Sequence, residues 1–242
     1  MVLEASQNLG WEVLHATGTV HEEIVTDSDR LLWFSYDITF SIACMKEIYI
    51  CEGKLMYGLV NQAIKEMVID GHGEAAWERI RSEAGVVDVF VSMHQYPEDL
   101  TDKLVKAASA ILQANPSEVL AGFGQYWVGF ASRNYDYVLD MSGQDFLTFV
   151  KNLNNMHARI GLWMPELKPP SFLVTDETPG GFKLQYRSSR SGYAPMVTGL
   201  LKGLGERFNT DVTVEHARGA GQGLDYEEFV VFYATRTPSA ML

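Results

Sequence analysis

The hydrophobic period of this sequence changes once, near Leu162, and that change limits the folds the chain can adopt. Before it, apolar residues recur every three or four positions, which is typical of amphipathic helices. After it, short apolar runs between turn residues predict strands. We expect five helices in the first part: about 59–70, 74–83, 97–112, one that starts after 115–117 and includes Trp127, and 144–162.

The second part contains four expected strands and one helix. The strands fall at about 172–175, 182–188, 212–216 and 229–234, and the helix at about 195–208 lies between them. Helices followed by an antiparallel sheet form an α+β architecture. We therefore expect an N-terminal helical subdomain followed by a small antiparallel sheet with one inserted helix.

Residues 1–55 do not fit this scheme, because they alternate weakly and have no clear helical face. They form a short strand or two, or a loosely ordered extension. A third explanation is a translation start assigned upstream of the true one, since Met56 is followed at once by a well-formed helical pattern. This third explanation is preferred, and it gives an extension at 1–55 and a main domain at 56–242.

Charge and cysteine content exclude several classes of function. The formal net charge is −12, which repels phosphate backbones and anionic lipid, so neither nucleic acid nor a membrane is expected as a partner. Cys44 and Cys51 are the two cysteines, so the main domain has no disulfide framework and no cysteine-based metal site. This composition indicates a cytoplasmic protein. The apolar stretch from Leu31 to Met45 is too short to span a bilayer.

His157 is the first candidate for chemistry. It lies four residues after Leu153 and three before Ile160, so it shares the apolar stripe of the expected fifth helix. An imidazole in an apolar interior is either a neutral core histidine bonded to a carbonyl or an axial ligand of a heme iron. The spacing alone leaves both explanations open, and the core histidine is the commoner of the two.

The segment Tyr186-x-Ser188-x-Arg190 is the second candidate. Alternation along a strand places these three donors on one face, after the apolar residues Phe182 and Leu184. A flat apolar ligand with two carboxylates at one edge, such as heme, suits that face, because arginine binds a carboxylate through two parallel bonds. Taken alone, an ordinary solvated strand face is the commoner explanation.

Two further patterns carry less information. Pro169-Pro170 ends the helix and stiffens the connection to the sheet, as a plain linker also would. The glycine-rich run 219–223 lies between two expected strands and does not open a helix, so it predicts a hairpin loop rather than a nucleotide site.

Together these segments resemble the heme-nitric oxide/oxygen-binding (H-NOX) family, which is related to the sensor domain of soluble guanylate cyclase. The opening 56–61 (MYGLVN), the run 123–127 (FGQYW), the helix 152–159 (NLNNMHAR), the double proline and the Y-x-S-x-R motif occur in family order from 56 to about 236. The first 55 residues resemble nothing in the family.

The resemblance assigns a role to each candidate. It implies one heme b, with His157 as the proximal iron ligand and Tyr186, Ser188 and Arg190 holding the propionates. Pro170 would press on the macrocycle. The distal side, where gas binds, would contain the following side chains: Val60, Trp127 and Met196.

One position of the sequence indicates which gas the heme would bind. Oxygen-binding members use a distal tyrosine five residues after the arginine of the motif, where this chain has Pro195. Tyr193 lies two residues too early, and Trp127 is expected to shape the pocket by packing. The resemblance therefore implies ferrous heme that binds nitric oxide (NO) and CO but not oxygen in air. An oxygen sensor or carrier is the alternative.

The same resemblance implies a sensor and not an enzyme. NO would weaken the bond between iron and His157, and the freed helix would signal to a separate effector, either a histidine kinase or a diguanylate cyclase/phosphodiesterase. A heme enzyme would need distal acid–base groups, and His72 and His94 lie outside the expected distal elements. A heme-free interaction module is the remaining alternative.

Overall fold

The computed structural model describes residues 18–21, 35–38, 55–87, 89–219 and 224–237. The chain divides into two compact units, Met1–Lys54 and Leu55–Leu242. In the first unit, strands β1 (Gly18–His21) and β2 (Ser35–Ile38) pair antiparallel. Its other positions, which hold most of the expected extension, lie outside the described residues.

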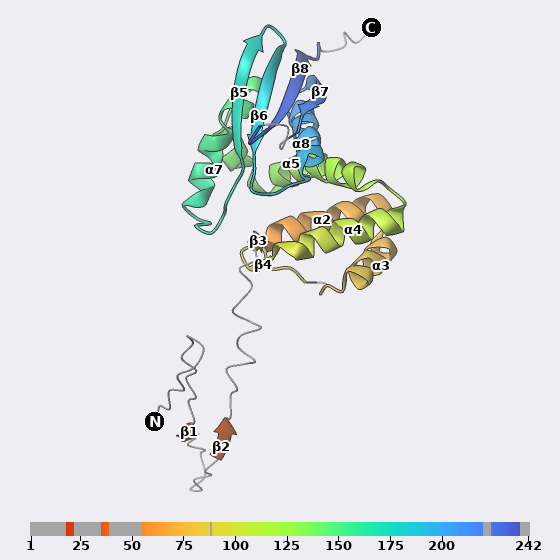
Figure 1. Cartoon of the computed structure of the whole chain (residues 1–242), viewed down its shortest axis with the longest axis vertical. Coiled ribbons are helices and arrows are strands. Elements are labelled where there is room, and N and C mark those ends of the chain that lie inside the picture. The colour runs from red at the N-terminus through yellow and green to blue at the C-terminus, as the bar shows by residue number, and fades with distance from the viewer. Residues whose placement is uncertain (1–17, 22–34, 39–54, 88, 220–223, 238–242) are drawn as a thin grey trace. The chain divides into compact units, whose positions relative to one another are not determined.

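The second unit begins with three helices that lie together (Figure 1): α2 (Gly58–His72), α3 (Glu74–Ala84) and α4 (Glu98–Leu112). Gly73 and Gly85 end the first two, with φ angles of 80° and 65° that favour glycine. Short strands β3 (Leu55–Tyr57) and β4 (Gln95–Pro97) pair beside α2 and α4. All three helices agree with the sequence prediction to within one or two residues.

Helix α5 (Pro116–Asp140) follows and is longer than the segment the sequence identified. Asn115 begins it with a capping box: its side chain accepts from the Ser117 amide, and its own amide donates to Glu118. The helix bends at Tyr135, where φ is −139°.

The expected helix at 144–162 is wrong in one respect, because the structure has two helices there. Helix α6 (Phe146–Lys151) ends at Asn152, and α7 (Leu153–Gly161) begins immediately after it. The Asn152 backbone leaves helical geometry, with ψ of 2°, and its side-chain amide donates to the Ser142 carbonyl. Asparagine competes with the helix by this kind of local hydrogen bond.

The sheet confirms the expected α+β class. Its strands are β5 (Ser171–Thr178), β6 (Gly181–Arg187), β7 (Thr210–Arg218) and β8 (Glu227–Thr235), all antiparallel in the order β5-β6-β8-β7. Helix α8 (Ala194–Arg207) is the inserted helix and packs against α5 and β7. A Cβ on Gly199 would overlap the Ala121 carbonyl, so this close packing requires glycine.

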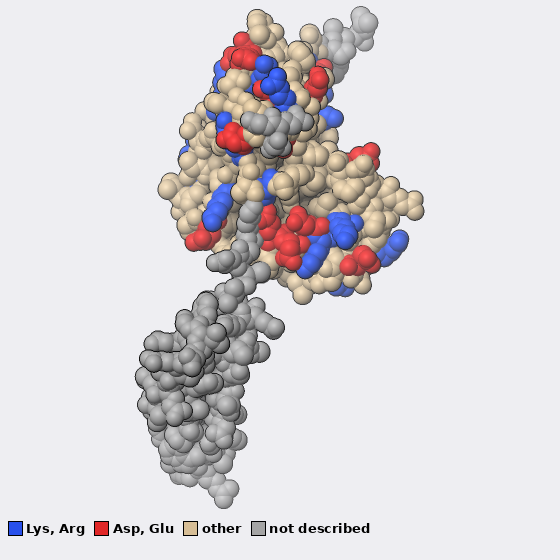
Figure 2. Space-filling view, in the orientation of Figure 1, with Lys and Arg blue, Asp and Glu red and all other residues tan. Residues whose placement is uncertain are grey.

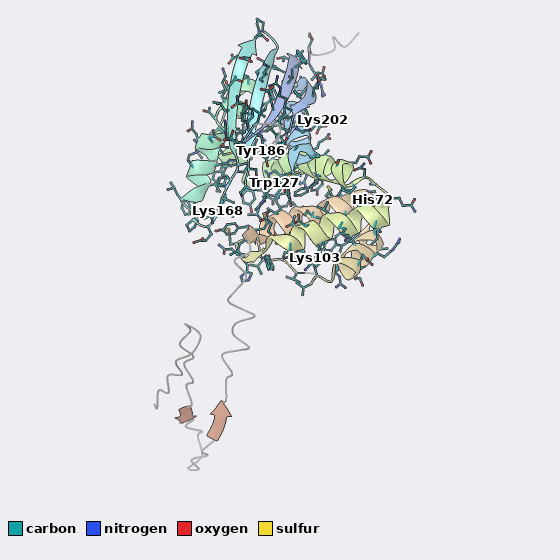
Figure 3. The ribbon with its side chains drawn as sticks, in the orientation of Figure 1. His72, Lys103, Trp127, Lys168, Tyr186 and Lys202 are labelled. Carbon is teal, nitrogen blue, oxygen red and sulfur yellow. The ribbon has the colours of Figure 1, made fainter. Side chains whose placement is uncertain are left out.

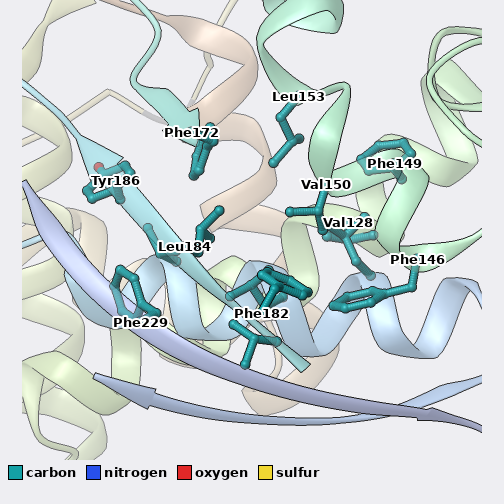
Figure 4. Packing of buried hydrophobic residues seen from close by; sticks show 14 of the residues in the cluster. Val128, Phe146, Phe149, Val150, Leu153, Phe172, Phe182, Leu184, Tyr186 and Phe229 are labelled. Atoms are coloured by element: carbon teal, nitrogen blue, oxygen red, sulfur yellow. The ribbon is translucent and has the colours of Figure 1, made fainter. Parts of the chain in front are cut away.

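Two apolar cores result. The sheet-side core contains buried residues of α6, α7, α8 and the sheet, several of which Figure 4 shows: Phe146, Phe149, Leu153, Phe172, Leu184, Tyr186 and Phe229. The helix-side core contains buried residues of α2 to α5: Ile64, Val68, Trp77, Ile80, Leu104, Phe123 and Phe130. No helix within the described part of the chain is both long enough and apolar enough to cross a membrane.

Candidate functional site

His157 lies on α7, and its ring nitrogen Nδ1 is buried without a hydrogen-bond partner among the described residues. Burial lowers the pKa of the imidazole below 6.5, because the charged form loses solvation. The Pro170 carbonyl partly offsets this shift, although no described contact to Nδ1 has the geometry of a hydrogen bond. Burial therefore favours the neutral imidazole, which is the form that binds a metal.

The side chain of Asn154 fixes helix α7 to strand β5 through two hydrogen bonds. Its amide group donates to the Phe172 carbonyl over 2.6 Å, and its amide oxygen accepts from the Phe172 N–H over 2.9 Å. Asn154 precedes His157 by three residues, so the two lie on one face of the helix. The sequence analysis did not single out Asn154. The signal that could have found it is its position three residues before His157 on an expected helix.

Three aromatic rings connect α7 to β6. The ring of Phe172 lies 6.0 Å from that of His157 and 5.4 Å from that of Tyr186, between centroids. Phe172 and Tyr186 are opposite each other in the β5–β6 register. Figure 4 shows Phe172 between Tyr186 and Leu153. The sheet thus brings the candidate iron ligand and the first residue of the Y-x-S-x-R segment to one apolar wall.

The other two residues of that segment lie beyond the strand. Strand β6 ends at Arg187, so the expected strand alternation through Ser188 and Arg190 is wrong. The Ser188 hydroxyl accepts from the Arg190 N–H over 3.0 Å and closes a turn instead. Burial raises the pKa of Tyr186, and the neighbouring Ser188 and Arg190 oppose that shift, so the three residues of the motif remain close together.

Arg190 extends toward the helical layer. Its Nε lies 2.5 Å from a carboxylate oxygen of Glu98, at the start of α4. Its Nη1 and Nη2 each lie 3.7 Å from the sulfur of Met56. The sequence analysis identified neither neighbour, because nothing in their spacing links them to a motif 90 residues or more away.

The three residues assigned to the distal side come from different helices. Val60 on α2, Trp127 on α5 and Met196 on α8 are partly buried and pack against the helix-side core. The Trp127 ring stacks on Phe130, 5.6 Å between centroids. Figure 3 shows Trp127 below Tyr186 in this view. A Cβ on Gly124 would overlap the Met196 carbonyl, so α5 and α8 meet closely here.

The Haem-NO-binding family model matches residues 57–216, more than half of the chain. The chain belongs to this H-NOX family. Soluble guanylate cyclase gcy-31 of Caenorhabditis elegans is 31% identical over 163 residues, which are 66% of this chain and 23% of that protein. Soluble guanylate cyclase 89Da of Drosophila melanogaster is 26% identical over 155 residues, 63% of this chain and again 23% of that protein.

Solved H-NOX structures share the fold. An H-NOX protein from S. oneidensis in the Fe(II)NO state superposes with a TM-score of 0.66 at 22% identity, over 74% of this chain and all of that one. The unliganded Fe(II) H-NOX protein from K. algicida gives a TM-score of 0.65 at 18% identity, over 75% of this chain and 98% of that one. The chain therefore spans whole H-NOX domains but only a quarter of the guanylate cyclases.

H-NOX domains bind heme, and the residues of this site fit that group. The buried Nδ1 of His157 has no hydrogen-bond partner among the described residues, and burial favours the neutral imidazole. The Phe172 ring provides an apolar surface beside it. At the far end of that wall, the phenol of Tyr186 and the guanidinium of Arg190 supply donors for carboxylates.

The Tyr193 hydroxyl is bonded to a residue of α4. It donates to Asp102 on α4 over 2.8 Å, and burial together with this carboxylate raises its pKa. A tyrosine bound in this way has no hydroxyl proton left to stabilise a bound gas. Pro195, in the first turn of α8, has neither a hydroxyl nor an N–H group.

Proposed function

We propose that this chain senses nitric oxide through one heme b held by His157. The observation that carries the proposal is the buried Nδ1 of His157, which has no hydrogen-bond partner among the described residues and lies at one end of an aromatic wall whose other end carries Tyr186. In this proposal Ser188 and Arg190 hold the propionates together with Tyr186. Pro170, directly before β5, packs against the macrocycle.

Bound heme would supply the iron that binds NO or CO. The protein's own residues orient that chemistry: Asn154 fixes the helix that carries His157, and Val60, Trp127 and Met196, which pack on the helix-side core, would line the gas side. Oxygen needs a hydrogen-bond donor that NO does not need, so this apolar side favours NO and CO.

His157 is also the movable part of the proposed switch. If NO binding loosened the hold of His157 on heme, α7 would still be restrained by Asn154 and by the connection at Pro170. A change in the position of α7 within those restraints would be the ligand-biased switch. The role is that of a sensor, and no catalytic residue is proposed.

We further propose that the signal passes to a separate effector, either a histidine kinase or a diguanylate cyclase/phosphodiesterase. This assignment rests on the family resemblance, whereas the relatives compared above are animal guanylate cyclases. Autophosphorylation and cyclic nucleotide turnover of candidate effectors, with and without NO, distinguish these partners. We also propose that the domain at 56–242 holds heme without the extension at 1–55, and heme content after removal of 1–55 tests this.

The direct test is reconstitution. Adding hemin to the heme-free protein under reducing conditions is expected to saturate at one heme per chain. The His157→Gly variant is expected to bind heme only when imidazole is added. Binding of equal strength without imidazole would contradict the role of His157.

A further inference from the structure

Arg190 is held by a carboxylate from another layer of the molecule. Its Nε lies 2.5 Å from Oε1 of Glu98, and the two side chains are 24% and 14% exposed. Solvent screens this ion pair less than the more exposed pairs elsewhere on the molecule. Figure 2 shows acidic side chains gathered in the region of β4 and the start of α4.

The other edge of the guanidinium meets a weaker acceptor. Nη1 and Nη2 each lie 3.7 Å from Sδ of Met56. A thioether accepts hydrogen bonds weakly, whereas two parallel N–H groups of arginine match the two oxygens of a carboxylate. Glu98 therefore accepts the hydrogen bond from Nε of Arg190. The Nη1 and Nη2 groups, which form the edge that can bind a carboxylate, contact the Met56 sulfur instead.

A second contact supports the same arrangement. Asp102 lies one helical turn after Glu98 on α4 and accepts from the Tyr193 hydroxyl over 2.8 Å. The guanidinium carbon of Arg190 lies 5.8 Å from the centre of the Tyr193 ring. Two side chains of α4 thus hold both ends of the segment 190–193 and set the direction of Arg190.

We propose that Glu98 is a positioning residue for heme: it binds Nε of Arg190 so that the Nη edge is presented to a heme carboxylate. This inference rests on the proposed heme binding. Arginine loses much side-chain freedom when it is fixed, and a partner that fixes it in advance reduces that loss when the ligand arrives. Glu98 thereby couples α4 to the carboxylate end of the heme site.

The geometry favours positioning over competition. A carboxylate that competed with heme would occupy the Nη pair, but the described ion pair uses Nε, and Nη1 and Nη2 contact Met56. Competition predicts that removing Glu98 strengthens heme binding, and positioning predicts that it weakens it. The two explanations therefore differ in the sign of one measurement.

The experiment follows heme loss from the reconstituted protein to an excess of a heme-scavenging globin. Glu98→Ala is expected to speed the loss of heme by about tenfold, the order of magnitude for the loss of one hydrogen bond to a charged group. Heme dimethyl ester, which has no carboxylates, is expected to leave both proteins at the same rate. Glu98→Gln, whose amide oxygen still accepts from Nε, is expected to fall between the wild type and Glu98→Ala.

Asp99→Ala is the matched control, because Asp99 lies in the same helical turn and pairs only with the exposed Lys103 in the described contacts. It is expected to match the wild type. Slower loss from Glu98→Ala, no change, or an equal effect on heme and its ester would each overturn the proposal. A wild-type protein that takes up no heme would instead contradict the proposed function.

Discussion

The wall that carries His157 and the wall that carries Trp127 differ in the contacts that hold them. On the first, which we call the proximal wall (α7, β5 and β6), polar contacts fix the backbone: Asn154 bonds both the N–H and the carbonyl of Phe172. On the second, the distal wall (Val60, Trp127 and Met196), partly buried apolar side chains pack on the helix-side core. An iron ligand requires a fixed direction, whereas NO and CO, unlike oxygen, bind without a hydrogen bond from the pocket.

The largest expected effect concerns the proximal wall itself. His157→Gly removes the only proposed bond to iron, so heme retention is expected to fall by more than about a hundredfold, beyond the range seen for outer partners of metal ligands. Added imidazole is expected to restore the heme spectrum. His72→Gly, at the last turn of α2, serves as the control and is expected to retain heme as the wild type does.

A gain of function tests the distal wall. Pro195→Tyr places a hydroxyl five residues after Arg190, where oxygen-binding members of the family carry one. One hydrogen bond to a polarised ligand contributes about 1.4 kcal/mol, so oxygen affinity is expected to rise by about tenfold. Oxygen titration by absorbance measures this, with Pro195→Phe as the control. An equal rise in Pro195→Phe would show that shape, and not a donor, controls the distal wall.

The attachment of α7 is tested by Asn154→Ala. This variant loses two hydrogen bonds to the Phe172 backbone, so the free energy of unfolding is expected to fall by roughly 1–2 kcal/mol. Asn155→Ala is the matched control, because Asn155 makes one exposed bond of 3.3 Å to Asn152. Denaturant unfolding compares them, and equal losses would contradict the special role of Asn154.

The smallest effect concerns a polar group outside both walls. Burial and the neighbouring Asp70 raise the pKa of Tyr126 to about 12, from 10.0. The folded state then keeps this proton at a pH where the unfolded state has lost it, so stability is present below pH 10 and declines as the pH rises toward 12. Tyr126→Phe is expected to flatten this decline in pH-dependent unfolding. An unchanged slope would show that Asp70 and burial do not act on this phenol.

The sequence predicted the architecture well, because it depends on periodicity. The change from helical to strand patterns and the start of α5 after 115–117 are both local signals. The break at Asn152 was missed, because apolar spacing continues through it while a side-chain bond to Ser142 interrupts the helix.

The site was predictable only in part. His157 and Tyr186 carry signals in their own segments, but their common wall depends on Phe172 and on the β5–β6 register. Glu98 and Met56 meet Arg190 across more than 90 positions of sequence. Such long-range pairs follow from how layers pack and leave no periodic trace in the sequence.

The most direct test of the central claim is the visible spectrum of the reduced, heme-loaded protein, recorded without oxygen, then in air and then with NO. We predict a five-coordinate ferrous heme with one histidine ligand, unchanged by air and converted by NO to a heme that has lost its histidine. A stable oxygen complex in air would contradict the gas assignment. A protein that remains colourless after heme is added would contradict the sensor function itself.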